Sequence, residues 1–262
     1  MYNNKLFSGF FDDLYVNEYI LIYDQNYNLI DKYRLDENKK AVPVPFTSAK
    51  SKMFGNIKPI DPYQELVMDS FKNNILTLIK GPAGSGKSIL SISYLFKCLE
   101  ESKIDKIIIF CNTVATAGSA RLGYYPGSRT EKLLDSQIGN FLISKLGDRF
   151  IVEKLIDEGK LLLLPMSDIR GFDTSGMKAG IYITEAQNLD VELMKLALQR
   201  IGDDCICILD GDSDAQVDLA LYSGNNNGLK RVSTVFRGTD IYGEVELPNI
   251  YRSQIANLAQ KL

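Results

Sequence analysis

The chain has 262 residues, of which 45% are hydrophobic, and its formal net charge is −3. This length fits one α/β domain with a small additional module, and the composition argues against global disorder and against a strongly basic nucleic-acid-binding protein. The sequence has no histidine, so acid–base chemistry must come from carboxylates, Lys, Tyr or Cys.

Membrane and zinc-binding classes are also disfavoured. No apolar run is long enough to span a bilayer, and the first residues lack the basic and then apolar layout of a signal peptide. The four cysteines form no C-x-x-C pair, which favours small buried hydrophobic residues over a zinc site. We therefore expect a cytoplasmic protein without membrane contact.

The N-terminal region predicts a small β-rich module. Residues 17–34 form two β-rich runs around the turn-like sequence DQNYN. Residues 36–62 are polar and contain four prolines, which is typical of a linker. We therefore divide the chain into residues 1–58, a β-rich module with its linker, and residues 59–262, a nucleotide-binding domain.

From residue 63 onward, short apolar runs alternate with helical segments, which predicts an α/β fold with a mainly parallel sheet flanked by helices. Strands are expected at 75–80, 106–111, 161–165, 181–184, 205–209 and 243–247. Helices are expected at 63–73, 88–101, around 130–158, and at 191–201, 227–236 and 254–262.

The stretch GPAGSGKS matches the phosphate-loop pattern G-x-x-x-x-G-K-[ST] between a predicted strand and a predicted helix. Glycines let the backbone amides point at a phosphate, and the helix start adds partial positive charge. Lys87 is expected to reach the β and γ phosphates of ATP, and Ser88 to bind Mg²⁺. The alternative is an ordinary glycine-rich turn. The expected nucleotide-binding residues are Gly81, Pro82, Ala83, Gly84, Ser85, Gly86, Lys87 and Ser88.

Carboxylates and glutamines follow two further predicted strands. In IYITEAQN, Glu185 follows an apolar strand and is a candidate to orient and deprotonate the attacking water; the alternative is a surface helix start. In ILDGDSDAQVD, Gln216 is a candidate sensor of the γ-phosphate, and the alternative is an acidic loop. Upstream, the amide of Gln64 has the donor and acceptor that an adenine edge requires, although a surface glutamine is the simpler interpretation in isolation.

These motifs, together with LGYYPGSRTEKL, PMSDIRG, NGLKRV and YRSQIANLA, follow one another as in the PhoH-like ATPase family, which the chain resembles from about residue 60 onward. NEYILIYD looks like the β-module that precedes the ATPase in PIN–PhoH fusion proteins. The resemblance implies a RecA-like P-loop fold, an ATPase related to superfamily one helicases, a role in RNA metabolism, and assembly into rings.

The resemblance also implies roles for individual residues. Gln64 matches the family's adenine-recognising glutamine. Arg170 and Arg252 match family arginines, and Arg252 is expected to stabilise charge at a neighbouring subunit's γ-phosphate. The loop before residue 130 corresponds to the polymer-contacting region, where the alternative for the two tyrosines is packing under the loop; its candidate side chains are Arg121, Tyr124 and Tyr125.

One departure from the family is chemically important. Most members have an aspartate where this chain has Thr184. Threonine can accept a hydrogen bond from a Mg²⁺-bound water but carries no charge, so weaker Mg²⁺ binding is expected. Asp210 and Asp212, near the end of the adjacent predicted strand, are candidates to restore the charge. We expect hydrolysis that is slowed but present.

The patterns favour binding and hydrolysis of ATP with Mg²⁺. The resemblance further implies stimulation by single-stranded nucleic acid, with RNA preferred, in a helicase-like ring such as a hexamer. The first alternative is a nucleotide-bound switch or adaptor with little turnover, because of Thr184. The second is a small-molecule kinase. The richness in Asn, Ile and Lys is typical of an AT-rich genome such as that of a phage, which would place the protein in the host cytoplasm.

Overall fold

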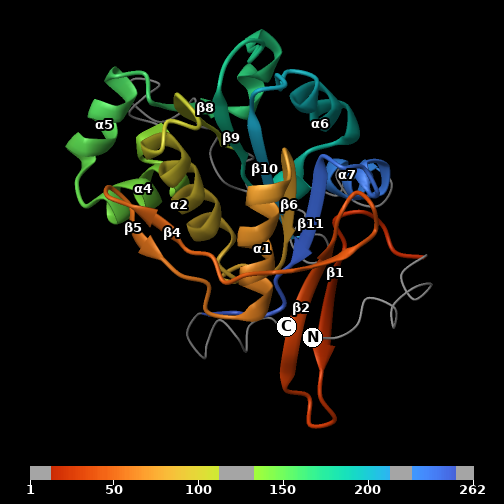
Figure 1. Cartoon of the computed structure of the whole chain (residues 1–262). Helices are drawn as coiled ribbons and strands as arrows, with labels where there is room; N and C mark the ends of the chain where they lie inside the picture. Colours follow the sequence, from red (N-terminus) through yellow and green to blue (C-terminus); the bar gives the residue numbers. More distant parts are fainter. Residues whose placement is uncertain (1–12, 112–132, 213–225, 252–262) are drawn as a thin grey trace, which may run out of the picture.

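A parallel six-stranded sheet lies at the centre of the computed structural model, which describes residues 13–111, 133–212 and 226–251 (Figure 1). The strand order is β11–β6–β10–β9–β7–β8, and every pairing is parallel. The prediction of an α/β fold with a mainly parallel sheet is confirmed. The strands are β6 (Leu76–Lys80), β7 (Lys106–Cys111), β8 (Leu161–Pro165), β9 (Ala179–Ile183), β10 (Ile206–Gly211) and β11 (Tyr242–Glu246).

Helices cover both faces of this sheet, as the apolar strands require. Ile208 and Tyr182 belong to the buried cluster on the face covered by α1 (Pro62–Asn73), α2 (Lys87–Glu100), α4 (Gln137–Leu146) and α5 (Arg149–Asp157). The alternate residues Leu209 and Ile183 belong to the cluster on the opposite face, under α6 (Val191–Leu198) and α7 (Gly228–Phe236). The helix predicted at 254–262 lies outside the described residues.

Most of the described helices are capped at their N-termini by a side chain of the protein. Five described helices have an N-cap side chain that accepts a hydrogen bond from a backbone amide of the first turn. Helix α2 differs, because its N-cap is a glycine in the left-handed conformation and no side chain caps it. The capped helices begin after Asp61, Ser136, Asp148, Asp190 and Asn227.

The predicted N-terminal β-module is present. Strands β1 (Tyr19–Tyr23), β2 (Leu29–Leu35) and β3 (Ala41–Pro43) form an antiparallel sheet that lies beside α1 and β11 (Figure 1). Asp69 of α1 accepts hydrogen bonds from the Tyr19 hydroxyl and from Arg34 Nε, both at 3.1 Å. The module is therefore fixed to the parallel-sheet domain by polar contacts.

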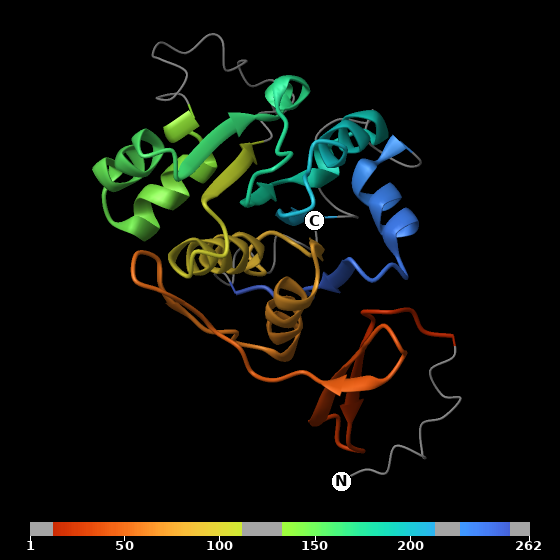
Figure 2. The same cartoon turned by 45° about the horizontal axis from the view of Figure 1, so that its top comes forward.

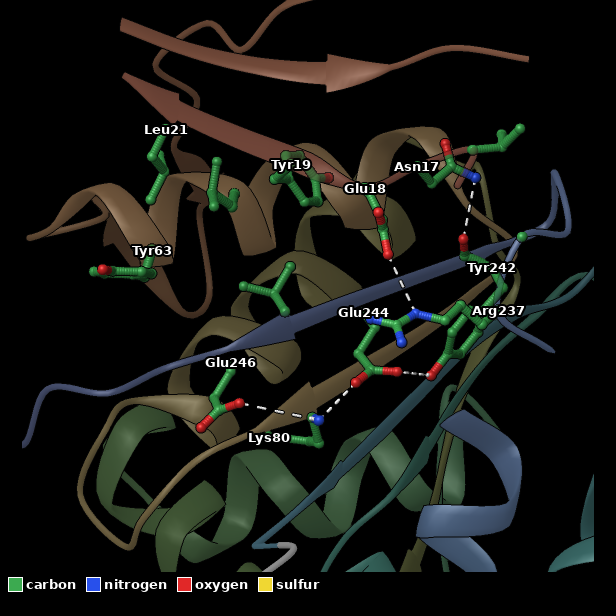
Figure 3. A pocket seen from close by; sticks show the side chains of 14 residues that line it. Asn17, Glu18, Tyr19, Leu21, Tyr63, Lys80, Arg237, Tyr242, Glu244 and Glu246 are labelled. Atoms are coloured by element: carbon green, nitrogen blue, oxygen red, sulfur yellow. Dashed lines mark hydrogen bonds and ion pairs between the residues drawn. The ribbon is translucent and has the colours of Figure 1, made fainter. Parts of the chain in front are cut away.

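A cavity of about 370 Å³ separates β1 from β11 (Figure 3). Its charged side chains are already paired, Glu18 with Arg237 at 3.2 Å and Glu244 with Lys80 at 2.6 Å. Buried Asn17 crosses the seam beside it and donates to the Tyr242 carbonyl at 3.0 Å. The Glu18–Arg237 pair and the Asn17 hydrogen bond hold the module to the domain, while the Glu244–Lys80 pair joins β11 to β6 within the sheet.

The linker interpretation of residues 36–62 is wrong, because this segment contains β3 and a hairpin of β4 (Ala49–Ser51) and β5 (Gly55–Ile57). Figure 2 shows the hairpin lying along α2. Glu100 at the end of α2 accepts hydrogen bonds from Ser51 Oγ at 2.8 Å and from two hairpin amides. Phe54 is buried against Phe96, with ring centroids 5.4 Å apart. The domain division at residue 58 stays a prediction.

None of the helices within the described ranges is long and apolar enough to cross a membrane.

Candidate functional site

The predicted phosphate loop connects β6 to α2, and its glycines are required by its geometry. Gly81, Gly84 and Gly86 have φ angles of +148°, +92° and +100°, which side chains rarely adopt. A Cβ on Gly81 would lie 2.5 Å from the Leu247 carbonyl oxygen, and one on Gly86 would lie 2.8 Å from Gln64 Nε2. The loop can therefore form only with glycine at these positions.

The open end of α2 fits an anionic ligand. The helix has no side-chain cap and no acidic residue in its first turn, so its first amides are left for another acceptor. Ser85 in the loop is 1% exposed, and its hydroxyl is one of two buried side-chain atoms without a hydrogen-bond partner in the described part of the chain. Buried polar atoms are normally bonded, so the loop offers unused donors of the kind that bind phosphate oxygens.

Lys87 supplies positive charge at this loop. Its Nζ donates hydrogen bonds to the carbonyl oxygens of Gly81 at 2.5 Å and Pro82 at 3.0 Å. The ammonium group therefore lies across the mouth of the loop, where a phosphate would compete with neutral carbonyls for it. A charged acceptor is the stronger partner.

The next residue, Ser88, lies beside a buried carboxylate. Its Oγ is 3.4 Å from Asp210 Oδ2, and Asp210 is 2% exposed at the carboxyl end of β10. Asp210 also accepts hydrogen bonds from the buried Tyr182 hydroxyl and from the Glu185 amide, the latter at 3.0 Å. Burial raises the pKa of Asp210 to about 6, against the lowering effect of the Lys87 ammonium. At neutral pH the carboxylate is mostly ionised.

Glu185 is exposed at the end of β9 and has an unusual backbone. Its φ of +52° lies in the left-handed region, where a non-glycine residue is strained. Its carboxylate accepts a hydrogen bond from Gln187 Nε2 at 2.7 Å, while Gln187 Oε1 accepts one from the Asp212 amide at 3.2 Å. Gln187, which was not predicted, thus connects the ends of β9 and β10. Its only sequence signal was its place in EAQN.

Gln64 is held by the protein backbone. Its Nε2 donates to the Ser85 carbonyl at 3.0 Å, its Oε1 accepts from the Ile60 amide at 3.1 Å, and the residue is 4% exposed. The side chain therefore supports the phosphate loop from the side of α1. Its predicted contact with adenine stays a prediction.

The segment after β11 also reaches the loop. The Tyr251 amide donates to the Gly84 carbonyl at 3.0 Å, and its hydroxyl donates to Asp61. Asn249 Nδ2 donates to the same carboxylate at 3.1 Å. This segment leads directly to residue 252, so the chain preceding the predicted charge-stabilising arginine lies against the phosphate loop.

Comparison with known protein families assigns the chain that carries this site to a family. A model of the family described as PhoH-like protein matches residues 56–262. The chain belongs to this family. The match covers the phosphate loop, the strands and both carboxylate-bearing strand ends.

Curated proteins similar to this chain are named Protein PhoH2 or PhoH-like protein. Protein PhoH2 of Bacillus subtilis is 32% identical over 195 residues, covering 72% of this chain and 42% of that protein. Protein PhoH2 of Thermobispora bispora is 30% identical over 186 residues, covering 70% and 42%. A PhoH-like protein of Bacillus subtilis is 31% identical over 180 residues, covering 68% and 54%. The chain thus spans about half the length of the curated relatives that it matches.

Family membership and loop geometry together identify a nucleotide-binding P-loop protein. The structure brings Lys87, Ser88, Asp210 and Glu185 to the carboxyl ends of β6, β10 and β9. Arg170 is exposed in the 3-10 helix after the edge strand β8, on the far side of the sheet order from β6. Several predicted residues lie outside the described part of the chain: Arg121, Tyr124, Tyr125, Gln216 and Arg252.

Proposed function

We propose that this PhoH-like chain binds ATP with Mg²⁺ at residues 81–88 and hydrolyses it. The observation that carries the proposal is the uncapped start of α2, where Lys87 lies across the loop carbonyls and Ser88 contacts the carboxylate of Asp210. A triphosphate supplies the acceptors that this loop lacks. Mg²⁺ is usually held by one or two protein groups together with substrate phosphates, and Ser88 and Asp210 fit that description.

Each side chain then has a defined task. The loop amides and Lys87 hold the β and γ phosphates, and the Ser88 hydroxyl faces the cation. Mg²⁺, when bound, neutralises charge that develops on the phosphates. The exposed Glu185 carboxylate is placed to orient a water and accept its proton. Its hydrogen bond from Gln187 fixes the direction of the carboxylate.

The switch alternative rests on Thr184, and the contact between Glu185 and Gln187 gives it a second physical basis. If Glu185 remains bound to Gln187 and never reaches a water, the chain binds ATP without releasing phosphate. The predicted outcome is slowed but measurable turnover. Phosphate release without an added acceptor also separates hydrolysis from the small-molecule kinase alternative.

Stimulation by single-stranded nucleic acid, with RNA preferred, and assembly into a ring belong to the same proposal. They are supported by the resemblance of the motifs and by Tyr251, the residue before Arg252, whose amide donates to the Gly84 carbonyl of the phosphate loop. An arginine in that position can serve the site of a neighbouring subunit in a closed ring.

Turnover of ATP, measured with and without single-stranded RNA or DNA, tests the proposal. Lys87→Ala is expected to lower ATP affinity and turnover at least about tenfold, because it removes the charge facing the phosphates. Lys97→Ala is the matched control on α2, since Lys97 lies in the last turn of the helix, where it forms an ion pair with Glu101 at 4.0 Å. Light scattering with and without ATP measures the assembly. Equal turnover in wild type and Lys87→Ala would refute the site.

A further inference from the structure

A buried carboxylate on β10 lies beside the residue that would face the cation. Asp210 Oδ2 is 3.4 Å from Ser88 Oγ, and its other oxygen accepts the Glu185 amide at 3.0 Å. The hydroxyl of Tyr182 donates to Oδ2 as well. Contacts from α2, from the middle of β9 and from the residue after Thr184 thus fix this carboxylate at the edge of the phosphate loop.

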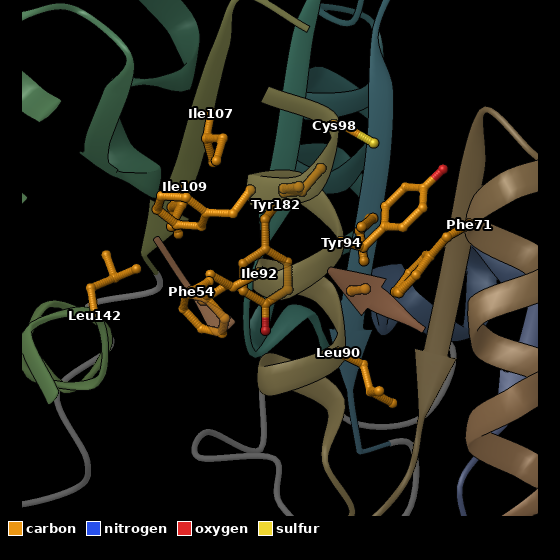
Figure 4. Close-up of a cluster of buried hydrophobic side chains, with 14 of the residues drawn as sticks. Phe54, Phe71, Leu90, Ile92, Tyr94, Cys98, Ile107, Ile109, Leu142 and Tyr182 are labelled. Carbon is orange, nitrogen blue, oxygen red and sulfur yellow. The ribbon is translucent and has the colours of Figure 1, made fainter. Parts of the chain in front are cut away.

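The sheet register places Thr184 and Asp210 at the same level. Leu209 of β10 pairs with Ile183 of β9 in a parallel ladder, and Asp210 and Thr184 are the residues that directly follow this last pair. Tyr182 and Ile208, one alternation earlier, both face α2. Figure 4 shows Tyr182 beside Ile92 of that helix. Asp210 faces α2, as its contact with Ser88 shows, and the alternation along β9 predicts the same face for Thr184; neighbouring strands lie about 4.8 Å apart.

We infer that Asp210, on β10, positions Ser88 and the water ligands of nucleotide-bound Mg²⁺. The side chain at position 184 is neutral and cannot supply the negative charge for this role. The inference rests on the proposed function. A carboxylate accepts hydrogen bonds from cation-bound waters and attracts the cation, whereas the Thr184 hydroxyl can accept the same bonds but adds no charge. Asp210 is a positioning residue here, because it acts through Ser88 and water.

Tyr182 and the Glu185 amide make this assignment specific to the chain. Both donate to Asp210 and leave its charge in place, so they orient the carboxylate without neutralising it. The other candidate carboxylate, Asp212, follows the end of β10, and its amide is bonded to Gln187. Asp212 is therefore the natural competitor in a test.

The test compares ATP affinity in Mg²⁺ with affinity in excess chelator, using a fluorescent ATP analogue and the full chain. Asp210→Asn is expected to reduce the Mg²⁺-dependent gain in affinity about tenfold, the effect of one screened charge near a divalent cation. Metal-free affinity is expected to stay equal or to rise, because a negative charge near the triphosphate is removed. A folding defect would lower both affinities. Asp203→Asn, at the exposed amino end of β10, is the matched control.

A second variant tests whether the carboxylate can act from either of the two neighbouring positions, 184 and 210. The exchange Thr184→Asp with Asp210→Thr keeps one carboxylate at this level and is expected to recover the Mg²⁺-dependent gain. If circular dichroism shows that Asp210→Asn does not fold, the exchange variant serves as the test in its place. The inference is overturned if folded Asp210→Asn keeps the wild-type ratio of the two affinities, or if Asp212→Asn loses it instead. Wild type without ATP affinity in either buffer would refute the proposed function itself.

Discussion

Replacing Asn17 tests whether the N-terminal module is an integral part of the nucleotide-binding domain. Asn17 is 5% exposed, and its Nδ2 donates to the carbonyl oxygens of Tyr242 at 3.0 Å and Asp240 at 3.1 Å (Figure 3). Its Oδ1 accepts a charge-assisted bond from Arg34 at 2.9 Å. Its φ is +64°, in the left-handed region that asparagine tolerates better than alanine.

The expected loss follows from these contacts. Two neutral hydrogen bonds contribute about 1 kcal/mol each, and the bond from Arg34 contributes about 1.5 kcal/mol or more. The left-handed backbone adds about 1 kcal/mol for alanine. Asn17→Ala is therefore expected to lower the free energy of unfolding by about 4.5 kcal/mol. Asn17→Asp, which keeps the acceptor for Arg34, should lose less.

Urea denaturation of the full chain measures this change. Asn28→Ala is the control, because Asn28 is exposed in the β1–β2 turn and its side chain bonds only to Asp24; its expected loss is under about 1 kcal/mol. If Asn17→Ala also lost less than about 1 kcal/mol, the seam between β1 and β11 would not couple the two parts, and the reasoning would fail.

Four further outcomes are expected. Phe54→Ala removes a buried ring stacked on α2 and should lower the free energy of unfolding in urea by about 3 kcal/mol, whereas a true linker would tolerate it. Gly86→Ala places a Cβ 2.8 Å from the Gln64 amide, so ATP affinity measured by titration should fall while helix content stays unchanged. Glu185→Gln should reduce phosphate release about a hundredfold with ATP affinity retained; a parallel loss of both would argue against a base. Burial acts to raise the pKa of Glu244, but hydrogen bonds from β6 and from neighbouring elements outweigh it, so the pKa is lowered. Its ionised form stabilises the fold above the unfolded pKa of about 4.3, and this contribution is lost as pH falls through the lower folded pKa, so Glu244→Gln should flatten the acid side of the stability curve.

The parallel-sheet domain was predictable because its signals are local. Contiguous apolar runs such as residues 106–111 and 161–165 can only be buried strands at this length, and they are β7 and β8. The phosphate loop was predictable because its backbone demands glycine at fixed spacing, as the φ angles of Gly81 and Gly86 show. These signals depend on neighbours in the sequence.

The hairpin at residues 49–57 could not be predicted for the opposite reason. Its strands have three residues each, and its anchor is Glu100, far along the chain at the end of α2. Prolines and polar residues therefore indicated a linker, while Phe54 and Ala49 in fact belong to the core. The bonds of Gln64 to Ser85 and of Tyr182 to Asp210 likewise appear only when the sheet register and the packing of α1 are known.

The same register explains why position 184 is neutral in this chain. Carboxylates at both 184 and 210 would lie on the same face of adjacent strands, about 5 Å apart, and would repel each other by about 3 kcal/mol at an effective dielectric constant near 20. Each would also lose hydration on burial, while the Tyr182 hydroxyl and the Glu185 amide are already committed to Asp210. A charge at both positions is therefore unfavourable. Asp210 is held by those donors, and the packing favours a neutral residue at 184. In this chain the carboxylate therefore lies at position 210 on β10, and Thr184 is its neutral neighbour.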